Sequence, residues 1–353
     1  MSKYFMPGPM RCSDEALEEL RKPIFSHRTP EAREVYMDVI QKVGQILGTK
    51  GRVVPVCASG TAGVEFMVSN LVKPSDHVLC LVNGHFSERM RDTVEIYSDS
   101  VETLGVELGD VVTPEEVEEA LKRHWANVVA LVSSETSTGA WTNVKEIAKI
   151  CQKYGSLLIV DHVSGVGNPY YMDEWKLDAT VTTTHESFSA PPGLAVIAFS
   201  SNAIEKNRQI PKRNLYFNLP EYLKSQEARE PPFTVPTTLL KGLRRNLVKI
   251  LEEGVENYFL RHERNAVILR QGLEDLGLSI FTKPRAYSNT VTAVQSPVSA
   301  TQLTTKLREE YGINIATGKD ILKEKVVRIS HAGVIQVQDI EMLLESLAKC
   351  LKW

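Results

Sequence analysis

The sequence of 353 residues lacks long runs of apolar residues and has no large excess of charge of either sign. No apolar run approaches the roughly 18 residues that a membrane-spanning helix needs, and the first residues show no signal-peptide core. Lys plus Arg number 41 and Asp plus Glu number 44, which gives a net charge of −3. This near balance argues against a nucleic-acid groove or a polybasic membrane patch. We therefore expect neither nucleic acid nor a membrane as a partner.

Cysteine is also scarce. The five cysteines are widely spaced and include no CxxC pair: Cys12, Cys57, Cys80, Cys151 and Cys350. A disulfide framework and a structural zinc site are both disfavoured, so we expect buried thiols, a cytoplasmic protein and no bound metal. At roughly 150 residues per domain, the length corresponds to about two domains.

Between residues 52 and 200, short apolar runs alternate with helical patterns. Strands are expected at residues 53–57, 77–82, 128–132, 157–160, 179–183 and 194–199. Helices are expected at residues 61–71, 114–124 and 143–154, among others. Several of the strands are apolar on both faces, which is typical of strands that helices cover on each side. The alternation predicts an α/β fold with a mainly parallel sheet.

After residue 200 the pattern changes. Residues 211–236 are polar and rich in proline, and we interpret them as a long connecting segment of the kind that is usually functional or part of an interface. A helical stretch follows at residues 238–276, with a break near Gly254. The last hundred residues alternate between helix and strand, which predicts a small α+β domain. Its strands are expected near residues 290–294, 313–316 and 326–329, and its helices at 300–311 and 337–351.

Two local features point to a ligand at the ends of strands. Residues 58–63 follow a strand and open a helix; small residues and the helix dipole favour a phosphate there, although such a turn needs Gly and Ser in any case. Asp161 closes a strongly apolar strand, where ligands of α/β proteins bind. Its alternative role is to cap the following turn.

Two further features concern a rigid loop and a solitary cation. Residues 184–193 end in Pro191, Pro192 and Gly193, which require a fixed turn. Arg328 lies on an otherwise apolar strand. An arginine is seldom buried without a partner, so Arg328 either pairs internally or binds a carboxylate ligand.

In their order along the chain, these features resemble the class V (fold-type I) pyridoxal-phosphate aminotransferases, particularly the serine/alanine–glyoxylate and serine–pyruvate group. The matching segments cover nearly the whole chain: residues 6–9, 26–31, 59–61, 83–89, 135–139, 161–164, 172–175, 190–194 and Arg328. The resemblance implies a large cofactor-binding domain with a mainly parallel mixed sheet (residues 26–245) and a small α+β C-terminal domain (residues 246–353). The N-terminal segment (residues 1–25) would pack with the small domain. It also implies a homodimer with shared active sites.

The resemblance implies a role for individual positions. The cofactor-binding residues would be Ser59, Gly60, Thr61, Phe86, Ser137, Asp161, Val163, His185 and Thr234. Asp161 would pair with the protonated ring nitrogen, Phe86 and Val163 would contact the two faces of the ring, and Thr234 would reach a phosphate across the dimer interface. Gly8 and Arg328 would bind the substrate, with the Arg328 guanidinium holding its α-carboxylate in a bidentate fork.

One position departs from the family. The family's Schiff-base lysine precedes the Pro-Pro-Gly turn, and counting back from Pro191 places Glu186 there. Lysine holds the cofactor aldehyde covalently and moves a proton, whereas glutamate forms no imine. Glu186 could act as a base if burial raised its pKa. We therefore predict Glu186 and Asp161 as catalytic residues and pyridoxal or pyridoxamine 5′-phosphate as a noncovalent cofactor.

Three explanations of Glu186 remain open. The chain is a laboratory variant of an aminotransferase, a natural lysine-free relative with altered, non-transaminase chemistry, or a pseudoenzyme that binds a ligand in the same pocket. The expected substrates are an amino acid and a 2-oxo acid, alanine or serine with glyoxylate or pyruvate.

A Rossmann dehydrogenase would need a G-x-G-x-x-G turn, which the residues after Ala58 do not supply. A cysteine desulfurase would need a cysteine between Cys151 and Cys350, and none is present.

Overall fold

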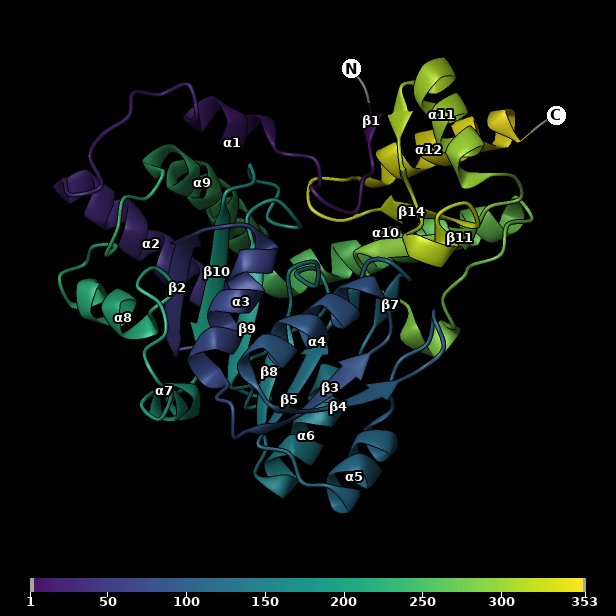
Figure 1. The fold of residues 1–353 in the computed structure, drawn as a ribbon. Helices are drawn as coiled ribbons and strands as arrows, with labels where there is room; N and C mark the ends of the chain where they lie inside the picture. Colours follow the sequence, from purple (N-terminus) through teal and green to yellow (C-terminus); the bar gives the residue numbers. More distant parts are fainter. Residues whose placement is uncertain (1–2, 352–353) are drawn as a thin grey trace.

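A seven-stranded sheet forms the centre of the larger region of the protein in the computed structural model, which describes residues 3–351 (Figure 1). In spatial order its strands are β2 (Arg52–Cys57), β10 (Leu194–Phe199), β9 (Ala179–Thr183), β8 (Leu157–Asp161), β5 (Val128–Val132), β3 (His77–Val82) and β4 (Ser100–Gly105). β10 runs antiparallel to both of its neighbours, and the other pairs are parallel. The predicted α/β class with a mixed, mainly parallel sheet is therefore confirmed.

Helices cover both faces of this sheet, which explains why its strands are apolar on both sides. On β3, Val78 and Cys80 belong to one core and Leu79 and Leu81 to the other, because successive side chains point to opposite faces. The first core is completed by α3 (Gly60–Leu71), α4 (His85–Tyr97), α7 (Ser201–Asn207) and α8 (Leu219–Glu227). The second is completed by α2 (Pro30–Ile46), α5 (Pro114–Arg123), α6 (Val144–Tyr154) and α9 (Thr237–Glu253).

Gly63 allows α3 to lie directly on the sheet. A Cβ atom at this position would lie 2.6 Å from the Cβ of Ala195 and 2.8 Å from a methyl group of Val181, closer than carbon atoms pack. The absence of a side chain therefore determines how near the N-terminus of α3 comes to the ends of the central strands.

The smaller region is built on a second sheet. β14 (Val326–Ser330) lies between β11 (Val291–Gln295) and β13 (Ala316–Thr317), and all pairs are antiparallel. α10 (Val255–Asp275), α11 (Ala300–Tyr311) and α12 (Val337–Cys350) supply its apolar core. Four short elements lie outside these two sheets. β6 (Ser134–Glu135) and β7 (Ala140–Trp141) form a two-stranded sheet after β5, and η1 (Pro284–Ala286) and η2 (Asp320–Leu322) are 3-10 helices.

The N-terminal segment contacts both regions. β1 (Lys3–Tyr4) pairs with β12 (Ile313–Asn314) of the small region, whereas α1 (Asp14–Glu19) packs on α9. Before α1, the Ser13 hydroxyl donates to Oδ1 of Asn246 at 2.7 Å. The predicted boundary between residues 245 and 246 lies inside α9, and the division into domains stays a prediction.

The structure departs from the sequence expectations in three places. The strand expected near residues 313–316 is divided into β12 and β13, which belong to different sheets. The proline-rich segment 211–236 contains α8, whose Pro220 lies in the first turn, where a missing N–H is tolerated. β4 was not expected, because it is a half-exposed edge strand without a continuous apolar run. The break at Gly254 is confirmed, since α9 ends and α10 begins on either side of it. None of the described helices is long and apolar enough to cross a membrane.

Candidate active site

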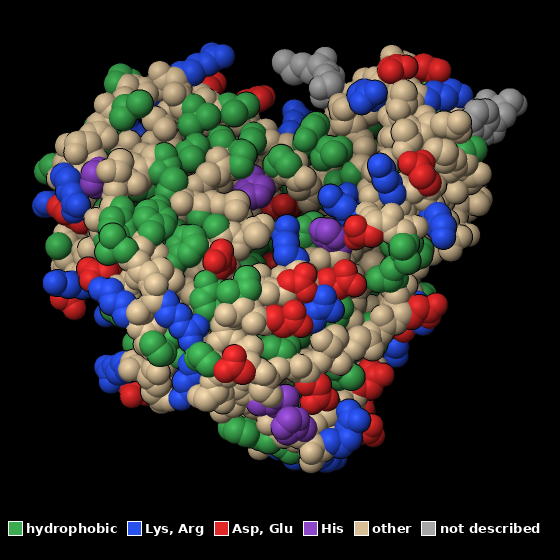
Figure 2. All heavy atoms as spheres, in the orientation of Figure 1, with side chains coloured by type: hydrophobic (Ala, Val, Ile, Leu, Met, Phe, Trp, Pro, Cys, Tyr) green, Lys and Arg blue, Asp and Glu red, His purple; other side chains and the backbone are tan. Residues whose placement is uncertain are grey.

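A cavity of about 340 Å³ opens at the carboxyl ends of the parallel strands, below the small region. Figure 2 shows a hollow between the two regions, with basic side chains around it and acidic atoms recessed inside. The predicted site residues that line the cavity are Gly8, Ser59, Gly60, Thr61, Phe86, Asp161, Val163, His185, Glu186 and Arg328. Ser137 and Thr234 do not line it.

The turn before α3 presents a helix N-terminus to the cavity. The hydroxyl of Ser59 accepts a hydrogen bond from the N–H of Ala62 at 3.3 Å and so caps the helix. The N–H groups of Gly60 and Thr61 belong to the first turn, where no intrahelical acceptor exists. A Cβ on Gly60 would crowd Thr183 and Val163, so the backbone passes close to the wall of the cavity. This turn can bind an anion such as a phosphate.

Asp161 ends β8 at the bottom of the cavity. Its Oδ1 accepts one hydrogen bond, from the N–H of Val163 at 2.9 Å. Burial raises the pKa of Asp161 to about 6, and the Arg89 guanidinium opposes this increase. A buried carboxylate in this state would be stabilised by a cationic N–H partner, which a protonated pyridine nitrogen provides.

Glu186 lies on the loop after β9, deep in the same cavity. Its Oε2 is buried and has no hydrogen-bond partner, and a Cβ on Gly8 would overlap its Oε1. Burial raises the pKa of Glu186 well above its ordinary value; Ser164 opposes the increase and the nearby Asp161 adds to it. The buried carboxyl therefore holds a proton more tightly than a glutamate in water does.

Arg328 projects from β14 of the small region and lines the same cavity. Its Nε donates to the carbonyl of Thr317 at 2.7 Å and one terminal nitrogen to the carbonyl of Thr136 at 3.2 Å. Burial lowers its pKa to about 10, so it stays charged at neutral pH. No carboxylate of the described residues forms an ion pair with it, which leaves part of the guanidinium for a ligand.

Phe86 and Ser137 are positioned by the buried carboxylate of Glu135. Oε2 of Glu135 accepts from the N–H groups of Phe86 and Ser87 at the start of α4, at 3.0 and 2.9 Å. Its Oε1 accepts from the hydroxyl of Ser137 at 2.6 Å. The Ser137 hydroxyl is thus engaged with Glu135, while the half-buried Phe86 ring lines the cavity.

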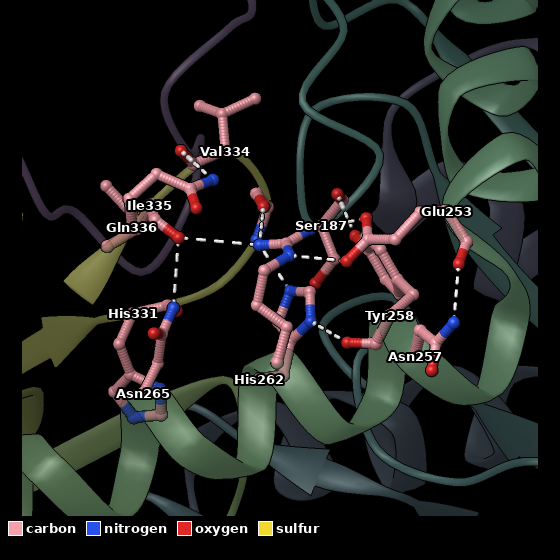
Figure 3. A network of polar contacts seen from close by, with 12 residues as sticks. Ser187, Glu253, Asn257, Tyr258, His262, Asn265, His331, Val334, Ile335 and Gln336 are labelled. Atoms are coloured by element: carbon pink, nitrogen blue, oxygen red, sulfur yellow. Dashed lines mark hydrogen bonds and ion pairs between the residues drawn. The ribbon is translucent and has the colours of Figure 1, made fainter.

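The loop that carries Glu186 is tied to the segment after β14 through α10 (Figure 3). The Tyr258 hydroxyl donates to the carbonyl of Ser187 at 2.6 Å. Burial lowers the pKa of His262 to about 3, so its ring is neutral. Its Nε2 accepts from the N–H of Gly333 at 2.8 Å, which assigns the proton to Nδ1, 2.6 Å from the carbonyl of Tyr258. These contacts hold Glu186 and Arg328 in a fixed relation.

Sequence reasoning missed two cations that line the cavity, Arg89 and Lys319. Arg89 lies over the ring of Phe86, 4.7 Å from its centroid. It belongs to the matching segment 83–89, and its spacing of three from Phe86 on one helix face was the available signal. Lys319 lies in a loop, where no periodicity indicates the direction of its side chain.

Known proteins of similar sequence and structure identify the family. The model of the family "Aminotransferase class-V" matches residues 21–343. An uncharacterized aminotransferase of Methanocaldococcus jannaschii is 36% identical over 355 residues, covering 98% of this chain and 92% of the relative. The L-aspartate–glyoxylate aminotransferase of Paracoccus denitrificans is 31% identical over 339 residues, covering 93% and 86%. The crystal structure of an alanine–glyoxylate aminotransferase from Nostoc sp. has a TM-score of 0.94 at 29% identity and covers 100% and 96%.

The fold is therefore that of the fold-type I pyridoxal-phosphate aminotransferases. The chain belongs to the class V aminotransferase family, an enzyme family whose cofactor is pyridoxal phosphate.

The buried carboxyl of Asp161 makes a prediction about stability and pH. Because the folded protein holds this proton more tightly than the unfolded chain, the free energy of unfolding should fall as the pH rises from about 4 through 6. A shift of roughly two pKa units corresponds to about 3 kcal/mol. We expect the cofactor-free protein to lose up to that amount relative to Asp161→Asn, measured by urea denaturation across this range.

The exposed Asp99 offers a matched control, and Asp99→Asn should follow the wild type across the same range. If the difference in the free energy of unfolding between wild type and Asp161→Asn does not change with pH, Asp161 is not an unpaired buried acid.

Proposed function

We propose that the protein binds pyridoxal or pyridoxamine 5′-phosphate noncovalently and transfers an amino group between a small amino acid and a 2-oxo acid. The observation that carries the proposal is the side chain of Glu186 inside the cavity, beside Asp161 and Arg328. The fold supplies the pocket of an aminotransferase, while the position that would carry the covalent link holds a group that forms no imine.

The polar atoms of the cavity fit this cofactor. Nδ1 of His185 and Oε2 of Glu186 are buried without a partner. Burial lowers the pKa of His185, so its neutral ring has one N–H to donate to a phosphate. The turn at Ser59 adds the N–H groups of a helix N-terminus, and Asp161 offers a carboxylate oxygen to a ring N–H. Each of these groups gains a partner when a phosphorylated pyridine binds.

Each residue of the cavity would have its own role in binding or proton transfer. Pyridoxal phosphate, when bound, supplies an electron-withdrawing ring that stabilises negative charge on the substrate carbon. Asp161 would keep the ring nitrogen protonated, and Phe86 and Val163 would fix the plane of the ring. Glu186 would hold the proton that the family's lysine otherwise moves, since burial raises the pKa of this carboxyl well above its ordinary value. Arg328 would hold the α-carboxylate.

The size of the cavity and the names of the relatives support the proposed substrate pair. Glyoxylate and pyruvate are small 2-oxo acids that a cavity of about 340 Å³ accommodates beside the cofactor. Two of the similar proteins are named for glyoxylate as the acceptor. We propose glyoxylate or pyruvate as acceptor and alanine or serine as the simplest amino donors.

A second copy of the chain would complete the site. The hydroxyl of Tyr216 donates to the carbonyl of Cys57, just before the anion-binding turn, and its ring stacks on Phe233, next to the exposed Thr234. Leu215 is 69% exposed, and apolar side chains gather over α1, α2 and α3 in Figure 2. These features support a homodimer in which Thr234 reaches the partner's phosphate site. The five unpaired cysteines support a cytoplasmic location.

Replacing Glu186 by lysine tests whether position 186 corresponds to the Schiff-base lysine of the family. We expect Glu186→Lys to attach the cofactor covalently, because the surrounding loop is that of a lysine-bearing enzyme. Borohydride reduction followed by mass spectrometry should find one cofactor on the peptide that contains position 186. It should find none in the wild type or in Glu186→Gln, which keeps the size of the side chain.

Assays of amino transfer accompany this measurement. The proposal expects alanine or serine to react with glyoxylate in Glu186→Lys. Absence of both the adduct and turnover in this variant would contradict the family's arrangement of the pocket. Turnover in Glu186→Lys together with a wild type that binds cofactor but never transfers an amino group would favour the pseudoenzyme.

Arg328→Lys tests carboxylate recognition. The variant keeps the charge but loses the planar two-bond geometry, so the affinity for pyruvate should fall by about 2–3 kcal/mol. Cofactor affinity should stay constant, since the phosphate site is elsewhere. Calorimetric titration of the cofactor-loaded protein measures both. Unchanged pyruvate affinity combined with a lower melting temperature would show that Arg328 is a structural residue.

A further inference from the structure

We infer that His77, Glu102 and His124 form a binding site for a divalent transition-metal ion, with Zn²⁺ the ion that this set of donors suits. The site lies at the amino end of β3, whereas the candidate active site lies at the carboxyl ends of the parallel strands. One ligand atom of each of the three side chains lies within 4.8 Å of the other two. The inference does not depend on the proposed function.

The pairing of β3 with β4 brings two of the ligands to one face of the sheet. The strands are parallel, and His77 lies opposite Ser100. Glu102 is two residues further along β4, so its side chain points to the same side as that of Ser100. The sequence expectation of no bound metal rested on the cysteines and on local spacing. It did not extend to residues that only the fold brings together.

The third ligand comes from the end of α5. The N–H of His124 donates to the carbonyl of Ala120 at 2.9 Å, which fixes its backbone just after the helix. The imidazole rings of His77 and His124 are stacked, with centroids 3.7 Å apart and an angle of 26° between their planes. Stacking places a nitrogen of each ring beside the carboxylate of Glu102.

The three ligand atoms face one another without good hydrogen bonds. Nε2 of His77 lies 3.5 Å from Oε2 of Glu102, and Nδ1 of His124 lies 3.7 Å from the same oxygen. Nε2 of His77 is shielded from water and has no hydrogen-bond partner. Neighbouring ligands of a tetrahedral zinc ion, with bonds of about 2.0–2.1 Å, are separated by about 3.4 Å. An ion between these atoms would therefore contact all three after small rotations of the side chains.

Neighbouring groups orient two of the ligands. Nδ1 of His77 lies 2.8 Å from the hydroxyl of Ser100. With its proton on Nδ1 and donated to this hydroxyl, the ring presents the lone pair of Nε2 to a metal, as histidine ligands commonly do. Oε1 of Glu102 lies 3.9 Å from the guanidinium of Arg123, and its Oε2 faces the two rings.

The donor set and its exposure determine the kind of site. Two imidazoles and one carboxylate suit Zn²⁺ and leave a fourth position for water. The side chain of His124 is 63% exposed, so an ion can enter from solvent. Figure 2 shows histidine side chains at the surface at the lower end of the molecule. In the described sheet β4 is an edge strand that pairs with β3 alone, so the ion would attach β4 and the end of α5 to β3. We therefore expect it to stabilise the fold.

Titration of the chelator-treated wild-type protein with Zn²⁺ tests the site. We expect calorimetry to find one tightly bound ion per chain and melting curves to shift to higher temperature, because the ion binds the folded state. Ser100→Ala should weaken binding by roughly ten- to a hundredfold, as when a hydrogen bond that orients a metal ligand is lost. His124→Ala and Glu102→Gln remove a ligand and should weaken binding at least as much.

Two matched variants serve as controls. His27→Ala removes a histidine outside the cluster, and Glu119→Gln neutralises an exposed glutamate of α5. Both should bind Zn²⁺ as the wild type does. Melting curves recorded without metal check that each variant is folded.

X-ray absorption of the zinc-loaded wild type identifies the ligands. We expect a first shell of nitrogen and oxygen at about 2.0–2.1 Å that includes two imidazoles. A sulfur ligand would assign the ion to a cysteine, such as the exposed Cys57, and overturn the inference. Absence of Zn²⁺ binding by the wild type would also overturn it, as would binding that persists unchanged in both His124→Ala and Glu102→Gln.

Discussion

Asp161 and Glu186 bring two carboxyl groups into one buried cavity, at the ends of the neighbouring strands β8 and β9. Burial raises the pKa of each carboxyl, and the charge of Asp161 raises the pKa of Glu186 further. Lysine at position 186 would place an amine, and not a second carboxyl, in this cavity. Here the position holds a buried carboxyl whose pKa is raised well above its ordinary value, and Arg89 and Arg328 supply positive charge to the cavity.

The surrounding structure keeps these groups in place. The loop after β9 is rigid within itself, since the N–H of Ala190 donates to the carbonyl of Thr184 at 2.9 Å and the Thr184 hydroxyl to the carbonyl of Pro191 at 2.6 Å. Asn246 of α9 donates to the carbonyls of Phe188 and Ser189, both at 2.8 Å. These contacts fix the backbone of the loop that carries Glu186, and its carboxyl lies in the buried cavity together with Asp161.

Much of the fold could be predicted from the sequence because the central strands are apolar on both faces. Residues 128–132 and 179–183 were predicted with the bounds that β5 and β9 have. β4 was missed because an edge strand carries a mixed pattern, and α8 was hidden by the prolines around it.

Some residues of the candidate site could also be predicted from the sequence, whereas others could not. Positions fixed by a strand end or a turn, such as Asp161, Ser59 and Glu186, line the cavity as the motifs suggested. The hydroxyl of Ser137 is held by Glu135, two residues before it, a side-chain contact that the motif alone does not indicate. Lys319 lies on a loop from the small region, and its approach to the cavity depends on how the two regions pack. The role of Thr234 depends on a second copy of the chain.

The most direct measurement is a crystal structure of the wild-type protein grown with pyridoxal 5′-phosphate. We expect density for a ring between Phe86 and Val163, with its nitrogen facing Asp161 and its phosphate at the N-terminus of α3, and no continuous density to any lysine. An empty cavity at saturating cofactor, or density joining the cofactor to Lys319 or another lysine, would contradict it.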